Sequence, residues 1–108
     1  MVKQGDIIKL NLSPTSGHEQ SGYRPAVVVS NDFAIAKTNV VYIAPISNTI
    51  RNFPLHVPLD ARTLTTGEIL CEQVKAVDLT ARQYTFIEHL PPDILEKALT
   101  CIIGCFDV

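Results

Sequence analysis

The sequence predicts a mostly β fold, a small and strongly curved antiparallel barrel with a helix packed on it. Short apolar runs recur along the chain, several with apolar residues at every second position, which is typical of strands. Polar segments containing glycine or proline separate these runs, and a longer helical pattern lies at the carboxyl end. Because the chain has 108 residues, we expect residues 1–108 to form one domain with its own core.

The first half of the chain contains three predicted strands. Residues 6–12 alternate between apolar and polar side chains, whereas residues 25–29 and 39–46 are continuous apolar runs. Alternation predicts a half-buried strand, and the continuous runs predict buried strands. Pro45 lacks a backbone N–H and therefore predicts an edge or a bulge where the third strand ends. Residues 33–37 predict a short helical turn.

The second half predicts the remaining strands. Residues 55–59 alternate again, with His56 pointing away from the apolar face. A further strand is expected over residues 65–73, extending at most to Val77, and a last short strand over residues 84–88.

The carboxyl-terminal segment predicts a helix. Residues 92–103 carry apolar side chains at helical spacing, with Pro92 in the first turn and Gly104 at the expected end. These side chains provide more apolar surface than one small barrel needs to cover. We therefore expect a homodimer.

Composition excludes several classes of protein. Apolar residues make up 46% of the chain and charged residues 19%, which excludes a disordered chain. The longest apolar run, residues 40–46, is far too short to cross a membrane, and the amino terminus predicts no secretory signal. A net charge of −2 is not typical of a protein that coats nucleic acid without specificity. Three cysteines without a CxxC pair predict reduced thiols in the cytoplasm and no structural zinc.

Two polar loops, residues 13–22 and 47–52, carry groups suited to phosphodiester cleavage. Such cleavage requires a base, an acid and a cation that stabilises charge on the phosphoryl oxygens. Each residue also has a structural interpretation. The candidates are His18, Glu19, Arg24, Ser47, Thr49 and Glu72. In the structural interpretation, His18 and Glu19 are solvated loop residues, and Arg24 ties loop carbonyls together. Ser47 and Thr49 are then turn hydroxyls, and Glu72 faces outward from a strand.

The loop sequences resemble a known family. Residues 17–20 read GHEQ and residues 22–25 read GYRP, within a segment from Gly5 to Val28 that resembles the opening of the MazF/PemK toxins of bacterial toxin–antitoxin modules. The similarity continues at residues 44–47 and 65–78 and in the terminal helix, so it covers nearly the whole chain. GHEQ and the CEQ of residues 71–73 resemble the PemK/Kid and ChpB branch.

The resemblance implies an SH3-like barrel of the MazF/CcdB type that forms a symmetric homodimer. It implies a sequence-specific endoribonuclease toxin, an mRNA interferase, that cleaves single-stranded RNA without a metal or cofactor and inhibits translation and growth. The partner is a cognate antitoxin with an acidic, disordered tail, and the location is the bacterial cytoplasm. Because the sequence offers no side-chain nucleophile with a dedicated base beside it, we expect the 2′-hydroxyl of the RNA to attack and leave a 2′,3′-cyclic phosphate.

The resemblance also assigns residues. Arg24 matches the family arginine, Ser47 stands where many members have threonine, and Glu72 stands where the PemK branch usually has aspartate. Because arginine stays protonated far above neutral pH, Arg24 is expected to clamp phosphate, leaving proton transfer to His18, Glu19 and Glu72 in roles that stay open. Leu70 replaces an arginine of a close relative. The residues expected to bind RNA are Gln20, Asn48, Thr49, Arg51, Gln73, Lys75 and Arg82.

Two other functions fit the same barrel. One is a non-catalytic gyrase poison of the CcdB type, which relies on a tryptophan near the carboxyl terminus, and the chain contains no tryptophan. The other is an inactive barrel that survives as a protein-binding module. The presence of both Arg24 and Ser47 argues against it.

Overall fold

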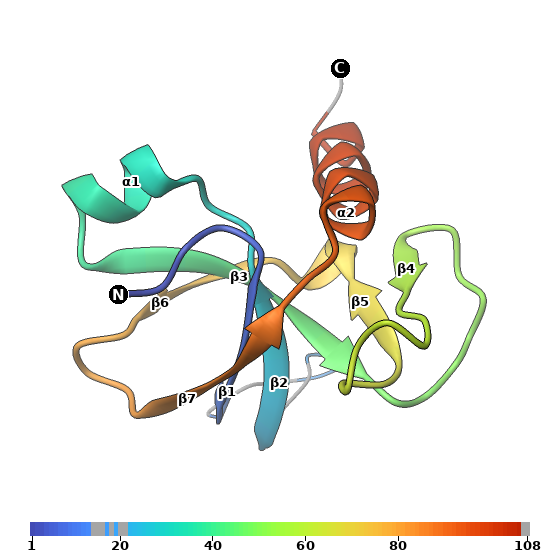
Figure 1. Ribbon diagram of the computed structural model, residues 1–108, viewed down its shortest axis with the longest axis horizontal. Coiled ribbons are helices and arrows are strands. Elements are labelled where there is room, and N and C mark those ends of the chain that lie inside the picture. The colour runs from blue at the N-terminus through green and yellow to red at the C-terminus, as the bar shows by residue number, and fades with distance from the viewer. Residues whose placement is uncertain (14–16, 18, 20–21, 107–108) are drawn as a thin grey trace.

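The computed structural model describes residues 1–13, 17, 19 and 22–106 (Figure 1). Its elements, in chain order, are β1 (Asp6–Asn11), β2 (Tyr23–Val28), α1 (Asp32–Lys37), β3 (Val40–Ser47), β4 (His56–Pro58), β5 (Glu68–Leu70), the 3₁₀ turn η1 (Cys71–Gln73), β6 (Lys75–Asp78), β7 (Tyr84–His89) and α2 (Pro92–Gly104). The expected helical turn and terminal helix are both present.

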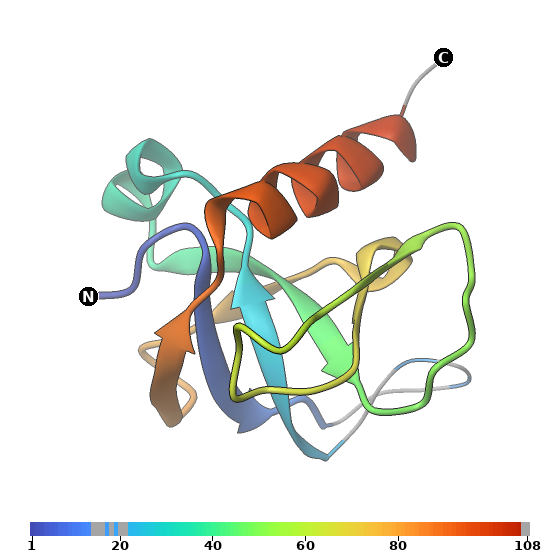
Figure 2. The same cartoon turned by 45° about the vertical axis from the view of Figure 1, so that its right-hand side comes forward.

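The seven strands form one antiparallel sheet in the order β4-β5-β3-β2-β1-β7, and β6 pairs with β3 beside β5. In the part of the chain that the structure describes, no pairing joins β4 to β7, so the curved sheet stays open. The helix α2 lies across one side of the sheet (Figure 2). The predicted class, a mostly antiparallel β fold with a terminal helix, is confirmed.

The central strands are buried on both faces. Ile7 and Val27 pack in a cluster with Ile94 of α2, whereas Ile8 and Val28 pack in a second cluster with Ile35 of α1. Because successive side chains of a strand point to opposite faces, strands covered on both sides need apolar residues at nearly every position. This explains the continuous apolar runs of the sequence. Among the described residues, no helix is long and apolar enough to span a membrane.

The strand expected over residues 65–73 is interrupted. β5 ends at Leu70, η1 follows, and β6 resumes the sheet at Lys75. The register gives the physical reason: Ile69 pairs with Ile46 and Val77 pairs with Val41. Ile69 and Val77 are eight positions apart in the sequence, whereas their partners on β3, Ile46 and Val41, are only five positions apart. Three residues must therefore leave the ladder, and the three residues of η1 do so.

The predicted effect of Pro45 is also different. β3 continues through Pro45 and ends at Ser47, and Pro45 itself pairs with Ala26 of β2. On its other side, β3 pairs with β6 up to Ile43 and with β5 from Ile46 onward. Pro45 lies between these two ladders, where its missing N–H interrupts neither.

Candidate active site

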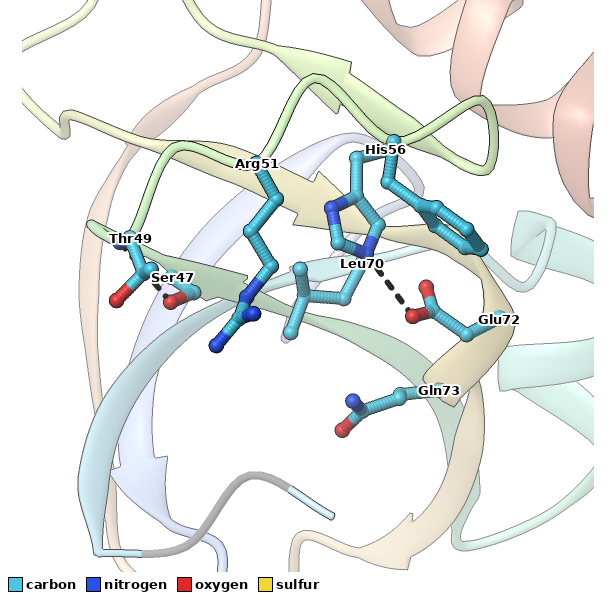
Figure 3. A pocket seen from close by; sticks show the side chains of 8 residues that line it. Ser47, Thr49, Arg51, His56, Leu70, Glu72 and Gln73 are labelled. Carbon is cyan, nitrogen blue, oxygen red and sulfur yellow. Dashed lines mark hydrogen bonds and ion pairs between the residues drawn. The ribbon is translucent and has the colours of Figure 1, made fainter. Parts of the chain in front are cut away.

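An open pocket of about 450 Å³ lies where β3 ends (Figure 3). The end of β3, the following loop, β4, β5 and η1 each contribute side chains to it. The lining residues are Ser47, Thr49, Arg51, Phe53, His56, Leu70, Glu72 and Gln73. Five of these residues were predicted from separate parts of the sequence to bind or cleave RNA and therefore share one surface: Ser47, Thr49, Arg51, Glu72 and Gln73.

Ser47 is fixed at the last position of β3. It is only 6% exposed, and its Oγ accepts a hydrogen bond of 3.2 Å from the backbone N–H of Thr49. Gly67, with φ of +117°, packs directly against it, and a Cβ at this position would collide with the Ser47 carbonyl oxygen. The close approach of the two segments therefore requires glycine.

Arg24 comes from the neighbouring strand. The last pair between β2 and β3 joins Ala26 to Pro45, and Arg24 and Ser47 each lie two residues beyond it on their own strands. Arg24 is exposed. The two residues that the family resemblance selected therefore lie near the same end of the β2–β3 pair.

The cationic side chain of the pocket itself is that of Arg51. Figure 3 shows it reaching between Ser47 and Thr49 on one side and Glu72 and Gln73 on the other. Its planar guanidinium has the donor geometry that matches a phosphate. The pocket therefore combines a cation, a hydroxyl and a carboxylate around one open volume.

Glu72 is held by a histidine that sequence analysis did not select. His56 Nε2 lies 2.9 Å from Glu72 Oε2, and His56 Nδ1 lies 3.2 Å from Glu68 Oε1. The His56 side chain is 5% exposed and that of Glu68 2% exposed, whereas that of Glu72 is 31% exposed. One imidazole thus bridges a buried carboxylate and a carboxylate that faces the pocket.

Buried Glu68 is held as a carboxylate. Its Oε1 accepts the backbone N–H of Arg51 at 3.1 Å and its Oε2 that of Asn52 at 3.4 Å. The Arg51 N–H, together with His56 and the Asn52 N–H, lowers the pKa of Glu68 against the opposing effect of burial. The backbone at Asn52 adopts a positive φ of 50°, which turns the loop around this carboxylate.

Three predicted RNA-binding residues lie outside this pocket. Asn48 Oδ1 accepts a hydrogen bond of 2.5 Å from Thr66 Oγ1. Lys75 Nζ donates to the Leu12 carbonyl oxygen at 3.3 Å, and an Arg82 guanidinium nitrogen donates to that of Asn11 at 2.7 Å. These two cations hold the chain where β1 ends and the β1–β2 connection begins. Their contact with RNA stays a prediction.

The structure describes only part of the predicted catalytic and RNA-binding residues of the β1–β2 connection. His18 and Gln20 lie outside the described residues, and Glu19 is exposed.

Within residues 1–13, 17, 19 and 22–106, no group of three or more His, Cys, Asp and Glu side chains is arranged to hold a metal ion.

His56 and Glu68 could not be selected as site residues from the sequence, for a physical reason. Twelve residues separate them, and only the β4–β5 pairing, in which His56 lies opposite Leu70, brings them together. The available signal was Glu68, a carboxylate at the start of a short apolar run, because a charge placed there needs buried partners.

The chain is similar to known proteins in sequence and in structure. It is 34% identical over 103 residues to "Endoribonuclease toxin MazF" of Escherichia coli (strain K12), covering 93% of this chain and 92% of that protein. It is 33% identical over 102 residues to "Endoribonuclease EndoA" of Bacillus subtilis (strain 168), covering 90% and 87%. The crystal structure of MazF (Form-I) from Deinococcus radiodurans superposes with a TM-score of 0.90 at 26% identity, covering 97% of this chain and 96% of that one.

Residues 3–106 match the family described as "PemK-like, MazF-like toxin of type II toxin-antitoxin system". This match spans the sheet, the pocket and α2, so it includes every element that forms the site. The chain belongs to the family of PemK-like, MazF-like toxins of type II toxin–antitoxin systems.

Proposed function

We propose that this protein is an endoribonuclease toxin that cleaves single-stranded RNA at specific sequences, using residues 1–108 as a single toxin domain. The observation that carries the proposal is the pocket in which Ser47, Arg51 and Glu72 meet, next to the strand end that bears Arg24. Family membership and relatives named as endoribonucleases support the same activity. They favour a nuclease over a gyrase poison or an inactive barrel.

The chemistry follows from the groups present. The 2′-hydroxyl oxygen attacks the adjacent phosphorus, the new O2′–P bond forms, and the P–O5′ bond breaks. A base accepts the 2′-hydroxyl proton, and an acid donates a proton to the leaving 5′-oxygen. Arg24 and Arg51 stabilise charge on the phosphoryl oxygens, and the Ser47 hydroxyl orients the phosphate. Glu72 performs one of the two proton transfers, with Glu19 and His18 as candidates for the other.

The family description places the protein in a toxin–antitoxin system. We infer a cognate antitoxin whose acidic tail is attracted to Arg24 and Arg51 and covers the pocket. Exposed apolar residues of α2 support a homodimer. The substrate is messenger RNA, so the site of action is the bacterial cytoplasm.

The decisive experiment incubates the purified protein with a long RNA and maps the cuts. We expect cleavage at a recurring sequence, the same rate with and without a chelator, and 2′,3′-cyclic phosphate ends. An oligonucleotide that spans a mapped cut, with one 2′-deoxy nucleotide 5′ of the scissile phosphate, should bind and resist cleavage. Cleavage of this substrate at an unchanged rate contradicts attack by the 2′-hydroxyl.

A further inference from the structure

We propose that His56 is a positioning residue for Glu72, held in place by the buried carboxylate of Glu68. The inference rests on the proposed function, because it concerns how the pocket presents a proton-transfer group to RNA. Three side chains in contact, Glu68–His56–Glu72, run from the interior to the pocket surface.

The inner end of this group of three side chains is rigid. Glu68 is 2% exposed and faces three donors: two backbone N–H groups of the loop after β3 and the Nδ1 of His56. A buried carboxylate with this many partners keeps its charge and its orientation. His56 Nδ1 must therefore carry a hydrogen, which fixes the direction of the ring.

The outer end contacts Glu72. His56 Nε2 lies 2.9 Å from Glu72 Oε2, within hydrogen-bond distance. This contact holds the carboxylate of Glu72, whose side chain is 31% exposed and lines the pocket (Figure 3).

Packing prevents the ring from turning away. Phe53 contacts His56 in an edge-on arrangement, with ring centroids 5.1 Å apart and planes at 66°. Pairing of His56 with Leu70 fixes the backbone on the other side. Glu68 and His56 are thus arranged like the carboxylate and histidine of a catalytic triad, in which a buried acid orients the imidazole. Here the imidazole acts through Glu72.

Two substitutions at His56 separate the two contacts. The Asn amide in His56→Asn reaches the position of Nδ1, so it keeps the contact with Glu68 and loses that with Glu72. The Gln amide in His56→Gln reaches the position of Nε2 and keeps the contact with Glu72. We expect single-turnover cleavage to fall about 10- to 100-fold in His56→Asn and no more than about threefold in His56→Gln. Binding of the 2′-deoxy oligonucleotide should stay within about twofold in both.

A double substitution tests whether His56 acts through Glu72. Adding His56→Asn to Glu72→Ala should cause no further loss, because the group that His56 positions is already absent. The matched control is His89→Asn, since His89 also pairs with a carboxylate, that of Asp6 at 2.7 Å, but is 76% exposed and lies outside the pocket. The control should cleave at the wild-type rate.

Equal rates for His56→Asn and the wild type would overturn the inference, as would equal losses in the Asn and Gln variants or an additive double substitution. If His56→Asn melts below the assay temperature, His56→Gly with added imidazole replaces it, and failure of imidazole to restore cleavage overturns the inference. A wild-type protein that cuts no RNA refutes the proposed function itself. A wild type that cuts, with Arg24→Ala inactive and His56→Asn fully active, refutes only the role of His56.

Discussion

At the scale of single residues, the proposed chemistry assigns charge stabilisation and proton transfer to different side chains. Because arginine is always protonated, we propose that Arg24 and Arg51 serve as fixed cations for a phosphate whose charge grows in the transition state. Glu72 and His56 are the titratable pair of the pocket lining, and Glu68 anchors them from below. Charge stabilisation and proton transfer can therefore be tested by different substitutions and different measurements.

Replacing Arg24 with alanine should abolish activity and leave the fold intact. The loss of one preorganised cation costs about 3–4 kcal/mol in the transition state, or about 10²- to 10³-fold in rate. Cleavage of the mapped oligonucleotide measures the rate, and circular dichroism measures the melting temperature. Arg62→Ala removes the same charge from an exposed network with Asp60 and Asp93 and should remain active. An unfolded Arg24→Ala protein would instead assign Arg24 a structural role.

The lowered pKa of Glu68 predicts a loss of stability in acid. The Arg51 N–H, the His56 contact and the Asn52 N–H hold this pKa below the value of 4.5 expected for an unperturbed glutamate. Between those two values the unfolded chain binds a proton that the folded chain does not, so stability falls as the pH falls through this window. Above it the contribution is fully present.

Thermal melting across a pH series tests this linkage. Glu68→Gln should lower the free energy of unfolding at neutral pH by roughly 1–3 kcal/mol, because an amide has only one oxygen that can accept. The substitution should also flatten the acid limb, the part of the curve in which stability falls with pH. The limb should not vanish, since Asp60, Asp78, Glu88 and Asp93 also have lowered pKa values. An unchanged acid limb would show that folding does not lower the pKa of Glu68.

At the scale of elements, the site depends on how β3 meets its neighbours. β3 pairs with β6 at its start and with β5 at its end. The segment that runs from β5 to β6 contains three more residues than the part of β3 that it faces, and these residues form η1. That turn moves Glu72 off the sheet and beside His56. Gly67 lets the segment before β5 approach Ser47 at the same point.

Gly67→Ala should therefore damage both stability and activity. A Cβ would collide with the carbonyl oxygen of Ser47, and the φ of +117° is unfavourable for alanine. We expect a loss of at least about 2 kcal/mol in unfolding free energy, measured by urea denaturation, with a parallel loss of cleavage. Gly104→Ala is the matched control, because it meets no atom within 4 Å at the end of α2, and should stabilise by about 0.5–1 kcal/mol. Similar effects of the two changes would contradict the close approach at Ser47.

At the scale of the whole molecule, the two sides of α2 differ. One side covers the sheet with Ile94 and Ala98, whereas Ile103 is 65% exposed and Phe106, two residues after the helix, is 75% exposed. Exposed side chains of this size, next to the partly exposed Tyr42 across an apolar groove, are typical of a subunit contact.

Sedimentation at micromolar concentration should give twice the 11.9 kDa mass of one chain. Introducing charge with Phe106→Glu and Ile103→Glu together should give the monomer mass, because unpaired charges cannot be buried at an apolar contact. The exposed Met1→Gln serves as the control, since it removes apolar surface at the opposite end of the chain. A wild type that sediments as a monomer would remove the basis for a shared RNA groove.

The fold class, both helices and most strand positions could be predicted from the sequence, and so could several residues that line the pocket. Strand and helix periodicity is local, and the GHEQ and GYRP motifs are contiguous, so both can be recognised without a structure. The interruption at η1 and the Glu68–His56–Glu72 chain were decided only by tertiary structure. Each depends on which distant residues β3 and β5 pair with, and local spacing contains no information about that register.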